Sequence, residues 1–160
     1  MTEAFIALGS NLGDAHGQVL GAFDALNKLP RTRLLDRSPL YLTPPWGVVD
    51  QPAFVNAVAR IDTALSPHDL LDALLAVERA AGRVRDGERW GPRTLDLDVL
   101  HMDGVVLSDE RLTLPHPRIA DRAFVLLPLH ALAPDLLLPG QGRVADLLAT
   151  VDAAGCERLP

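Results

Sequence analysis

The sequence has a single cysteine, a single lysine and no long apolar run, and each scarcity excludes a class of protein. One thiol, Cys156, excludes an internal disulfide and is compatible with a reducing compartment. The longest apolar stretches, such as FVLLPLHALAP, are too short and too interrupted to cross a bilayer. The N-terminal stretch MTEAFIAL lacks the basic segment and the long apolar segment after it that mark a secretory signal. We therefore expect a cytoplasmic protein without a membrane partner.

Two common site signatures are also missing. No group of Cys and His residues has zinc-binding spacing. The only lysine, Lys28, lies in a predicted helix, so the GK[ST] of a P-loop does not occur. The net charge of −6 argues against general binding of nucleic acid. The 160 residues fit a single domain, 1–160, which we expect to be a monomer.

The basic residues that are present are almost all arginine, and they cluster. Five of them fall between residues 79 and 93: Arg79, Arg83, Arg85, Arg89 and Arg93. An acidic protein that concentrates arginine in one loop is suited to hold a compact polyanion, because guanidinium groups bind phosphate in a bidentate manner. A merely solvated loop is the alternative.

The hydrophobic pattern predicts six elements in the first hundred residues, in the order strand, helix, strand, strand, helix, strand. The expected strands span 4–8, 33–42, 54–62 and 95–100, and the expected helices span 15–29 and 67–81. Residues 9–14 and 102–105 read as turns and 43–52 as a loop. A short strand at 105–107, a helix near residue 124 and a helix at 144–150 are expected to follow. This order predicts an α+β class, with a ferredoxin-like βαββαβ core and an added C-terminal hairpin and helices.

The stretch RWGPRTLDLDVL, residues 89–100, places two aspartates in the last strand of that core. Asp96 and Asp98 share one face, about 7 Å apart along the chain, while Leu95, Leu97 and Val99 can face the core. Adjacent like charges destabilise a strand unless a cation lies between them. Nearby arginines could supply that cation in a salt-bridge network. The other solution is Mg²⁺, which takes one or two carboxylates plus substrate phosphates.

Three further side chains have open interpretations. Glu78 falls on the leucine face of its helix, so it needs a partner, either a salt bridge to Arg83 or a role near a nucleotide. His116, between two prolines and near three arginines, is either structural or part of an anion site. Phe124 begins an apolar helix and by pattern alone is a core residue. Phe54 and Asn56 share the strand face away from the expected core.

Taken together, GSNLGD, YLTPPWG, RWGPRTLDLDVL and LTLPHPR followed by DRAF resemble the 6-hydroxymethyl-7,8-dihydropterin pyrophosphokinases of folate synthesis. The resemblance runs from about residue 3 to residue 136. It implies transfer of pyrophosphate from ATP, as co-substrate, to the hydroxymethyl group of the pterin, giving AMP. It also implies two Mg²⁺ ions held by Asp96 and Asp98, with ATP and the pterin as small-molecule partners.

The resemblance implies the following site residues. The catalytic residues are Arg83, Arg93, Asp96 and Asp98. The ATP-binding residues are Glu78, Arg83, Arg85, Trp90, Arg93, Val99, Arg111, Leu112, Thr113, His116 and Arg122. The pterin-binding residues are Thr43, Pro44, Trp46, Phe54, Asn56, Trp90 and Phe124, which replaces the core interpretation of Phe124 by a ring that stacks on the pterin.

The chain departs from the family pattern at three positions. Phe54 stands where many members have Tyr, Trp46 where many have Leu, and Asp86 where some have a basic residue. No side chain is an obvious general base, and Asp98 is the best candidate to assist deprotonation of the hydroxyl. A two-metal phosphodiesterase and a non-catalytic small-molecule sensor are the rival interpretations. AMP formation that depends on pterin distinguishes them.

Overall fold

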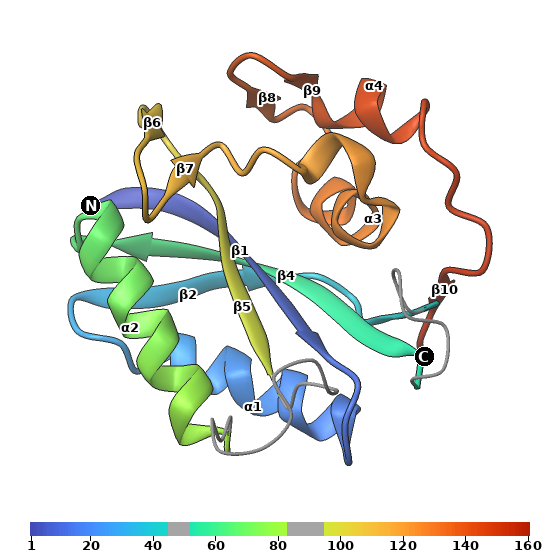
Figure 1. The fold of residues 1–160 in the computed structure, drawn as a ribbon, viewed down its shortest axis with the longest axis horizontal. Helices are drawn as coiled ribbons and strands as arrows, with labels where there is room; N and C mark the ends of the chain where they lie inside the picture. Colours follow the sequence, from blue (N-terminus) through green and yellow to red (C-terminus); the bar gives the residue numbers. More distant parts are fainter. Residues whose placement is uncertain (45–51, 83–94) are drawn as a thin grey trace.

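The computed structural model describes residues 1–44, 52–82 and 95–160. It is a mixed α/β fold in which helices cover both faces of one antiparallel sheet (Figure 1). The sheet comprises β1 (Thr2–Ser10), β2 (Thr32–Arg37), β3 (Tyr41–Thr43), β4 (Phe54–Thr63), β5 (Asp96–Met102) and β10 (Glu157–Arg158). The strands lie in the order β10-β3-β4-β1-β5, and β2 also pairs with β4. The predicted sequence of elements is present, and β1 lies between β4 and β5 in the sheet.

One strand that the sequence predicts as continuous, 33–42, is two strands. The long strand β4 pairs with β2 along its second half and with β3 along its first half. Between them, Ser38 bonds to Val58 twice: its backbone N–H donates to the Val58 carbonyl, and its hydroxyl accepts from the Val58 N–H, both at 2.9 Å. Pro39 follows and has no N–H to offer the ladder, which explains the break.

Two helices cover one face of the sheet. In α1 (Ala15–Asn27), the N-cap Asp14 accepts a hydrogen bond from the Gly17 N–H at 3.0 Å. In α2 (Pro67–Ala80), Ser66 is the N-cap and Pro67 opens the first turn, as predicted. These helices bury Phe23, Leu70 and Leu74 against the inward-facing residues of β1, β4 and β5 to form the main core.

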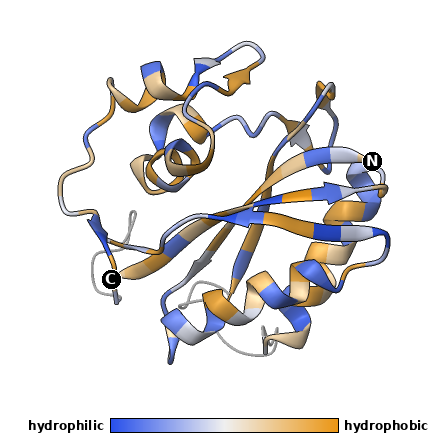
Figure 2. Ribbon diagram, turned by 180° about the vertical axis from the view of Figure 1, so that it is seen from behind, coloured by the Kyte–Doolittle hydropathy of each residue, from blue (hydrophilic) through white to orange (hydrophobic). Residues whose placement is uncertain are grey.

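The opposite face of the sheet carries a second core, which corrects one expectation. The sequence pattern assigns the even positions of β4 to the face away from the core, yet Val58 is fully buried. It packs with α3 (Ala123–Leu132), α4 (Val144–Leu148) and the short 3-10 helix Ile119–Asp121, through residues such as Leu126 and Leu129. Figure 2 shows hydrophobic segments in the sheet and in the helices on both sides of it. The assumption that one face of the strand is exposed is therefore wrong for β4, which is buried on both sides around Val58.

Two small hairpins complete the fold. β6 (Leu107–Ser108) pairs with β7 (Thr113–Leu114), and β8 (Leu137–Leu138) pairs with β9 (Gly142–Arg143). The strand predicted at 105–107 therefore begins only at Leu107. Within residues 1–44, 52–82 and 95–160, no helix has the length and apolar character that crossing a membrane would require.

Candidate active site

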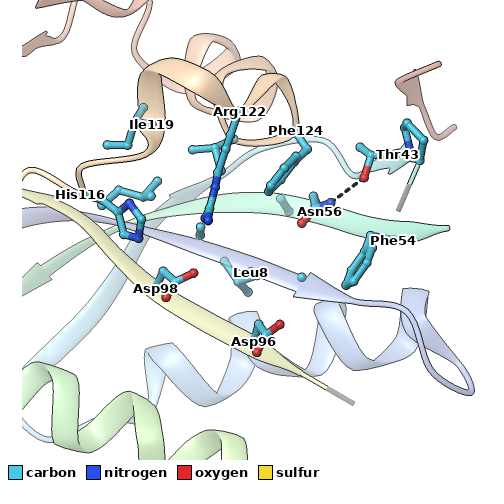
Figure 3. Close-up of a pocket in the computed structure, with 16 residues that line it drawn as sticks. Leu8, Thr43, Phe54, Asn56, Asp96, Asp98, His116, Ile119, Arg122 and Phe124 are labelled. Atoms are coloured by element: carbon cyan, nitrogen blue, oxygen red, sulfur yellow. Dashed lines mark hydrogen bonds between the residues drawn. The ribbon is translucent and has the colours of Figure 1, made fainter. Parts of the chain in front are cut away.

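A cavity of about 540 Å³ opens between the sheet and the helix layer of α3 (Figure 3). Its walls come from β1, β3, β4 and β5 and from the segment 116–125. The lining residues are Ala7, Leu8, Gly9, Thr43, Pro44, Phe54, Asn56, Ala57, Asp96, Asp98, Leu100, His116, Ile119, Arg122, Phe124 and Val125. Five sequence segments therefore meet in one cavity, and nine of the predicted site residues are among the residues that line it.

The floor of the cavity is set by strand register. Gly9 on β1 pairs with Asn56 on β4 and with Asp96 on β5. Ala7, two residues earlier, pairs with Asp98 in the same way. Neighbouring strands lie about 4.8 Å apart, so Asn56 and Asp96 stand roughly 10 Å apart across the small residues of β1. The Asn56 amide and the two carboxylates can therefore bind opposite ends of one ligand.

The two aspartates lie as the strand pattern predicts. Asp96 is half-buried and Asp98 exposed, both toward the cavity, whereas Leu95, Leu97 and Val99 are buried in the main core. No group of three or more His, Cys, Asp or Glu side chains in the described segments could hold a metal ion. Two oxygen ligands facing an open cavity are the donor set that suits Mg²⁺, which completes its coordination with water and phosphate oxygens. These residues therefore fit the ion that the resemblance implies.

Glu78 has a partner that sequence analysis does not anticipate. Its carboxylate is 3% exposed and accepts a hydrogen bond from the backbone N–H of Leu97 at 2.7 Å. Leu97 lies between the two aspartates on β5, at the end of the sheet order. The Glu78 carboxylate thus accepts a backbone hydrogen bond that a further strand beside β5 would otherwise accept. The predicted alternative partner, Arg83, lies outside the described residues.

The aromatic end of the cavity is built on β3, β4 and α3. Phe54 and Phe124 come from different layers, and Asn56 lies between them in Figure 3. The Asn56 amide donates to the Thr43 hydroxyl at 2.7 Å, and both side chains are buried. Phe124 packs partly against the second core and also lines the cavity, so the core interpretation describes only one side of its ring. This end can receive a flat polar heterocycle.

His116 lies at the other end, beside Asp98. Its backbone N–H donates to the Leu100 carbonyl at 2.8 Å, which ties it to β5. Its ring Nδ1 accepts from the Arg118 N–H at 3.1 Å, so the neutral imidazole carries its proton on Nε2. Burial lowers the pKa of His116; Asp98 opposes that shift, while Arg122 and Arg118 add to it. The ring is therefore a neutral donor at neutral pH.

Arg122 is the cation of the cavity among the residues described. Its guanidinium lies 5.6 Å from the centroid of the Phe124 ring, in a cation–π arrangement. Within residues 1–44, 52–82 and 95–160 it has no ion-pair partner within 4.0 Å, in contrast to Arg111. Arg122 is thus positioned to bind an anion that enters the cavity.

Several predicted ATP-binding residues lie away from this cavity. Val99 is buried in the main core, and Leu112 packs against that core. Arg111 forms an ion pair with Asp72 at 2.5 Å on the outside of α2, and Thr113 lies in the β6–β7 hairpin. These residues do not line the cavity, and neither does Glu78. Trp46, Arg83, Arg85, Asp86, Trp90 and Arg93 lie outside the described residues.

Sequence analysis missed the residues that form the cavity floor and its apolar back. Gly9 belongs to β1 rather than to a turn beginning at residue 9. A Cβ on Gly9 would lie 2.6 Å from Asn56 Oδ1, so glycine is required beside that amide. The glycine can be seen in the sequence, as part of GSN. The reason for it depends on the pairing of β1 with β4, which places Asn56 opposite Gly9. The other residues missed are Ala7, Leu8, Ala57, Leu100, Ile119 and Val125.

Solved structures with a similar fold come from longer proteins. HPPK-DHPS of Plasmodium falciparum superposes with a TM-score of 0.72 at 14% identity, over 92% of this chain and 45% of that chain. The chain thus spans less than half of that protein's length. At this identity the likeness shows the fold alone.

Sequence comparison is more specific. The chain is 54% identical over 158 residues to the 2-amino-4-hydroxy-6-hydroxymethyldihydropteridine pyrophosphokinase of Pseudomonas aeruginosa, covering 99% of this chain and 97% of that protein. It is 50% identical over 159 residues to the enzyme of the same name from Methylorubrum extorquens, covering 99% of each. The family model for 7,8-dihydro-6-hydroxymethylpterin-pyrophosphokinase (HPPK) matches residues 5–134. On sequence and fold together, the chain belongs to the HPPK family.

Proposed function

We propose that this protein transfers pyrophosphate from ATP to the hydroxymethyl group of 6-hydroxymethyl-7,8-dihydropterin, giving the pterin diphosphate and AMP in folate biosynthesis. The observation that carries the proposal is one cavity with an aromatic and amide end on β3, β4 and α3 and a carboxylate pair on β5. The first suits a flat heterocycle, and the second suits a metal-bound polyphosphate. Both substrates can then meet in the middle.

At the pterin end, Phe54 and Phe124 hold the ring between their faces. Asn56 and Thr43 present an amide carbonyl, an amide NH₂ and a hydroxyl to its polar edge. Because Asn56 is itself held by Thr43, its amide is oriented before the pterin binds, which lowers the entropic cost of recognition. Pro44 closes this side, and Trp46 remains a predicted pterin contact.

At the phosphate end, Asp96 and Asp98 would hold two Mg²⁺ ions. Metal bound there would neutralise charge on the transferring phosphoryl group and lower the pKa of the attacking hydroxyl. Arg122 and the neutral His116 bind phosphate oxygens by donating N–H groups. The remaining predicted ATP contacts are Glu78, Val99, Arg111, Leu112 and Thr113, together with Arg83, Arg85, Trp90 and Arg93.

The reaction is a displacement at the β-phosphorus of ATP. The pterin hydroxymethyl oxygen forms a bond to that phosphorus, the bond to the bridging oxygen of the α-phosphate breaks, and AMP leaves. Asp98, the exposed carboxylate of the pair, is our candidate to take the hydroxyl proton. Arg83 and Arg93 are expected to stabilise the charge that develops on the transferring group.

The arrangement of the chain supports further parts of the proposal. The strand order β3-β4-β1-β5, with α1 and α2 on one face, supports the ferredoxin-like βαββαβ core that we propose. The β6–β7 and β8–β9 hairpins and the helices α3 and α4 lie outside this core. We propose that residues 1–160 act as one pyrophosphokinase domain, as a cytoplasmic monomer.

An assay that separates AMP from ADP tests the function. Purified protein with ATP, Mg²⁺ and 6-hydroxymethyl-7,8-dihydropterin should form AMP and pterin diphosphate in equal amounts. Omitting the pterin should abolish AMP formation. AMP or ADP released at the same rate without pterin would contradict the proposal and favour a phosphohydrolase.

A further inference from the structure

We propose that the C-terminal strap, residues 153–160, is a positioning element that holds the Thr43–Pro44 wall of the cavity in place and so sets the affinity for pterin. No motif marks this segment, and the family model ends at residue 134. The inference rests on the proposed function, because it concerns the pterin end of the same cavity. It adds residues that do not themselves line the cavity.

The strap joins the sheet beside β3. Glu157 pairs with Leu42 and Arg158 with Tyr41, in antiparallel register. The Leu159 N–H donates to the Leu40 carbonyl at 2.8 Å, and the Leu159 side chain packs against the main core. β3 is only three residues long and lies between β4 and β10. Without the strap, β3 would be a very short strand held along one side.

A second contact lies directly behind Pro44. Gly155 has a φ of +84°, and a Cβ built on it would lie 3.5 Å from Pro44 Cγ and 3.7 Å from Pro44 Cδ. The backbone of the strap therefore passes close to the proline ring that lines the cavity. A Cβ at this position would be in ordinary van der Waals contact with Pro44, and the branched side chain of valine would add atoms beside that contact.

Displacing Pro44 would reach the pterin-binding groups through Thr43. Thr43 pairs with Phe54 across β3 and β4, and its hydroxyl accepts the hydrogen bond that orients Asn56. A shift of this short strand therefore changes the aromatic ring and the amide together. The phosphate end is built on β5 and the segment 116–122, which the strap does not pair with.

The route of the chain explains why the strap can act as a brace. The chain leaves α4, in the layer that carries Phe124, and continues through the strap to β3 in the sheet (Figure 1). The turn that redirects it is closed by the Ala154 N–H donating to Asp152 Oδ1 at 2.9 Å and the Cys156 N–H donating to the Ala153 carbonyl at 3.1 Å. The strap thus connects the two walls between which the pterin is proposed to bind.

The test substitutes Gly155 in the full chain and uses Gly104 as the matched control. Gly104 has a φ of +73° and no atom within 4 Å of a built Cβ, so Gly104→Val carries the backbone strain without the contact. We expect Gly155→Val to raise the KM for pterin by about fivefold or more, with kcat and the KM for ATP changed by less than about twofold. Gly155→Ala should have a smaller effect, since 3.5 Å is ordinary van der Waals contact.

Leu159→Ala is a second variant that loosens the strap without positive-φ strain. It should raise the KM for pterin selectively, and calorimetric titration of pterin in the presence of a non-hydrolysable ATP analogue should show the same loss. Equal effects of Gly155→Val and Gly104→Val, or equal changes in both substrates' KM in both strap variants, would overturn the inference. Absence of pterin-dependent AMP formation in the unsubstituted protein would instead overturn the proposed function.

Discussion

Gly9 and Asn56 lie opposite each other on β1 and β4, and the glycine leaves room for the Asn56 carboxamide oxygen. That oxygen is 2.6 Å from where a Cβ on Gly9 would stand. The other end of the amide donates to the Thr43 hydroxyl at 2.7 Å. The amide is therefore held on one side by a hydrogen bond and accommodated on the other by a missing side chain.

The variant Gly9→Ala should weaken pterin binding. The new methyl group forces the Asn56 amide to rotate, which breaks its bond to Thr43 at a net cost of about 1 kcal/mol. We expect the KM for pterin to rise about fivefold, with a smaller change in the KM for ATP. Gly21→Ala is the control, because a Cβ on this α1 residue meets no atom within 4 Å. An unchanged KM for pterin in Gly9→Ala would remove Asn56 from the proposed site.

The carboxylate pair should be needed for turnover and not for folding. Asp96→Ala and Asp98→Ala should each lower kcat by about a hundredfold or more, since metal-stabilised charge is lost. The unfolding temperature of Asp98→Ala without Mg²⁺ should equal or exceed that of the unsubstituted chain, because the like charge two residues from Asp96 has been removed. Asp103→Ala, in the exposed turn after β5, is the matched control. Near-normal turnover in either cavity variant would refute the metal assignment.

The pKa of His116 should move in opposite directions in two variants. Asp98 favours the imidazolium and Arg122 disfavours it, although burial is the largest influence. Asp98→Asn should therefore lower the pKa of His116, and Arg122→Gln should raise it. Proton NMR titration of the imidazole resonances measures both. Shifts of the same sign would show that the ring does not lie between these two charges.

Stability should fall on mild acidification because of His101. This ring is 4% exposed, its Nδ1 has no hydrogen-bond partner among the described residues, and burial lowers its pKa despite the opposing effect of Asp103. The folded state then binds protons less readily than the unfolded state. The contribution of His101 to stability is therefore complete above pH 6.5, the ordinary pKa of histidine. It is lost as the pH falls toward the lower pKa of the folded state.

Denaturant unfolding between pH 7.5 and pH 5 measures this effect, which for one group amounts to at most about 1.4 kcal/mol per pH unit. His101→Gln should flatten the profile relative to the unsubstituted chain. The exposed His68, which lies 2.7 Å from Asp109, provides a comparison variant that should retain the loss on acidification. An unchanged slope in His101→Gln would show that this ring does not govern acid stability.

Much of the fold could be predicted from local pattern. The cap at Ser66, the alternation that turns Asp96 and Asp98 to one face, and the order of strands and helices all depend on residues close together in the chain. Such features follow from backbone geometry and side-chain periodicity. The second core around Val58 could not be predicted, since it depends on which elements pack over the strand.

For the site, the sequence by itself determined the chemistry: two carboxylates at strand spacing, a histidine between prolines, and the aromatic and amide residues of β4. Only the tertiary structure decided their relationships. Strand register placed Gly9 between Asn56 and Asp96, and β10 placed Gly155 behind Pro44, more than a hundred residues away in the chain. A residue's spacing along a strand is local, but its neighbours across the sheet are selected by the packing of the whole chain.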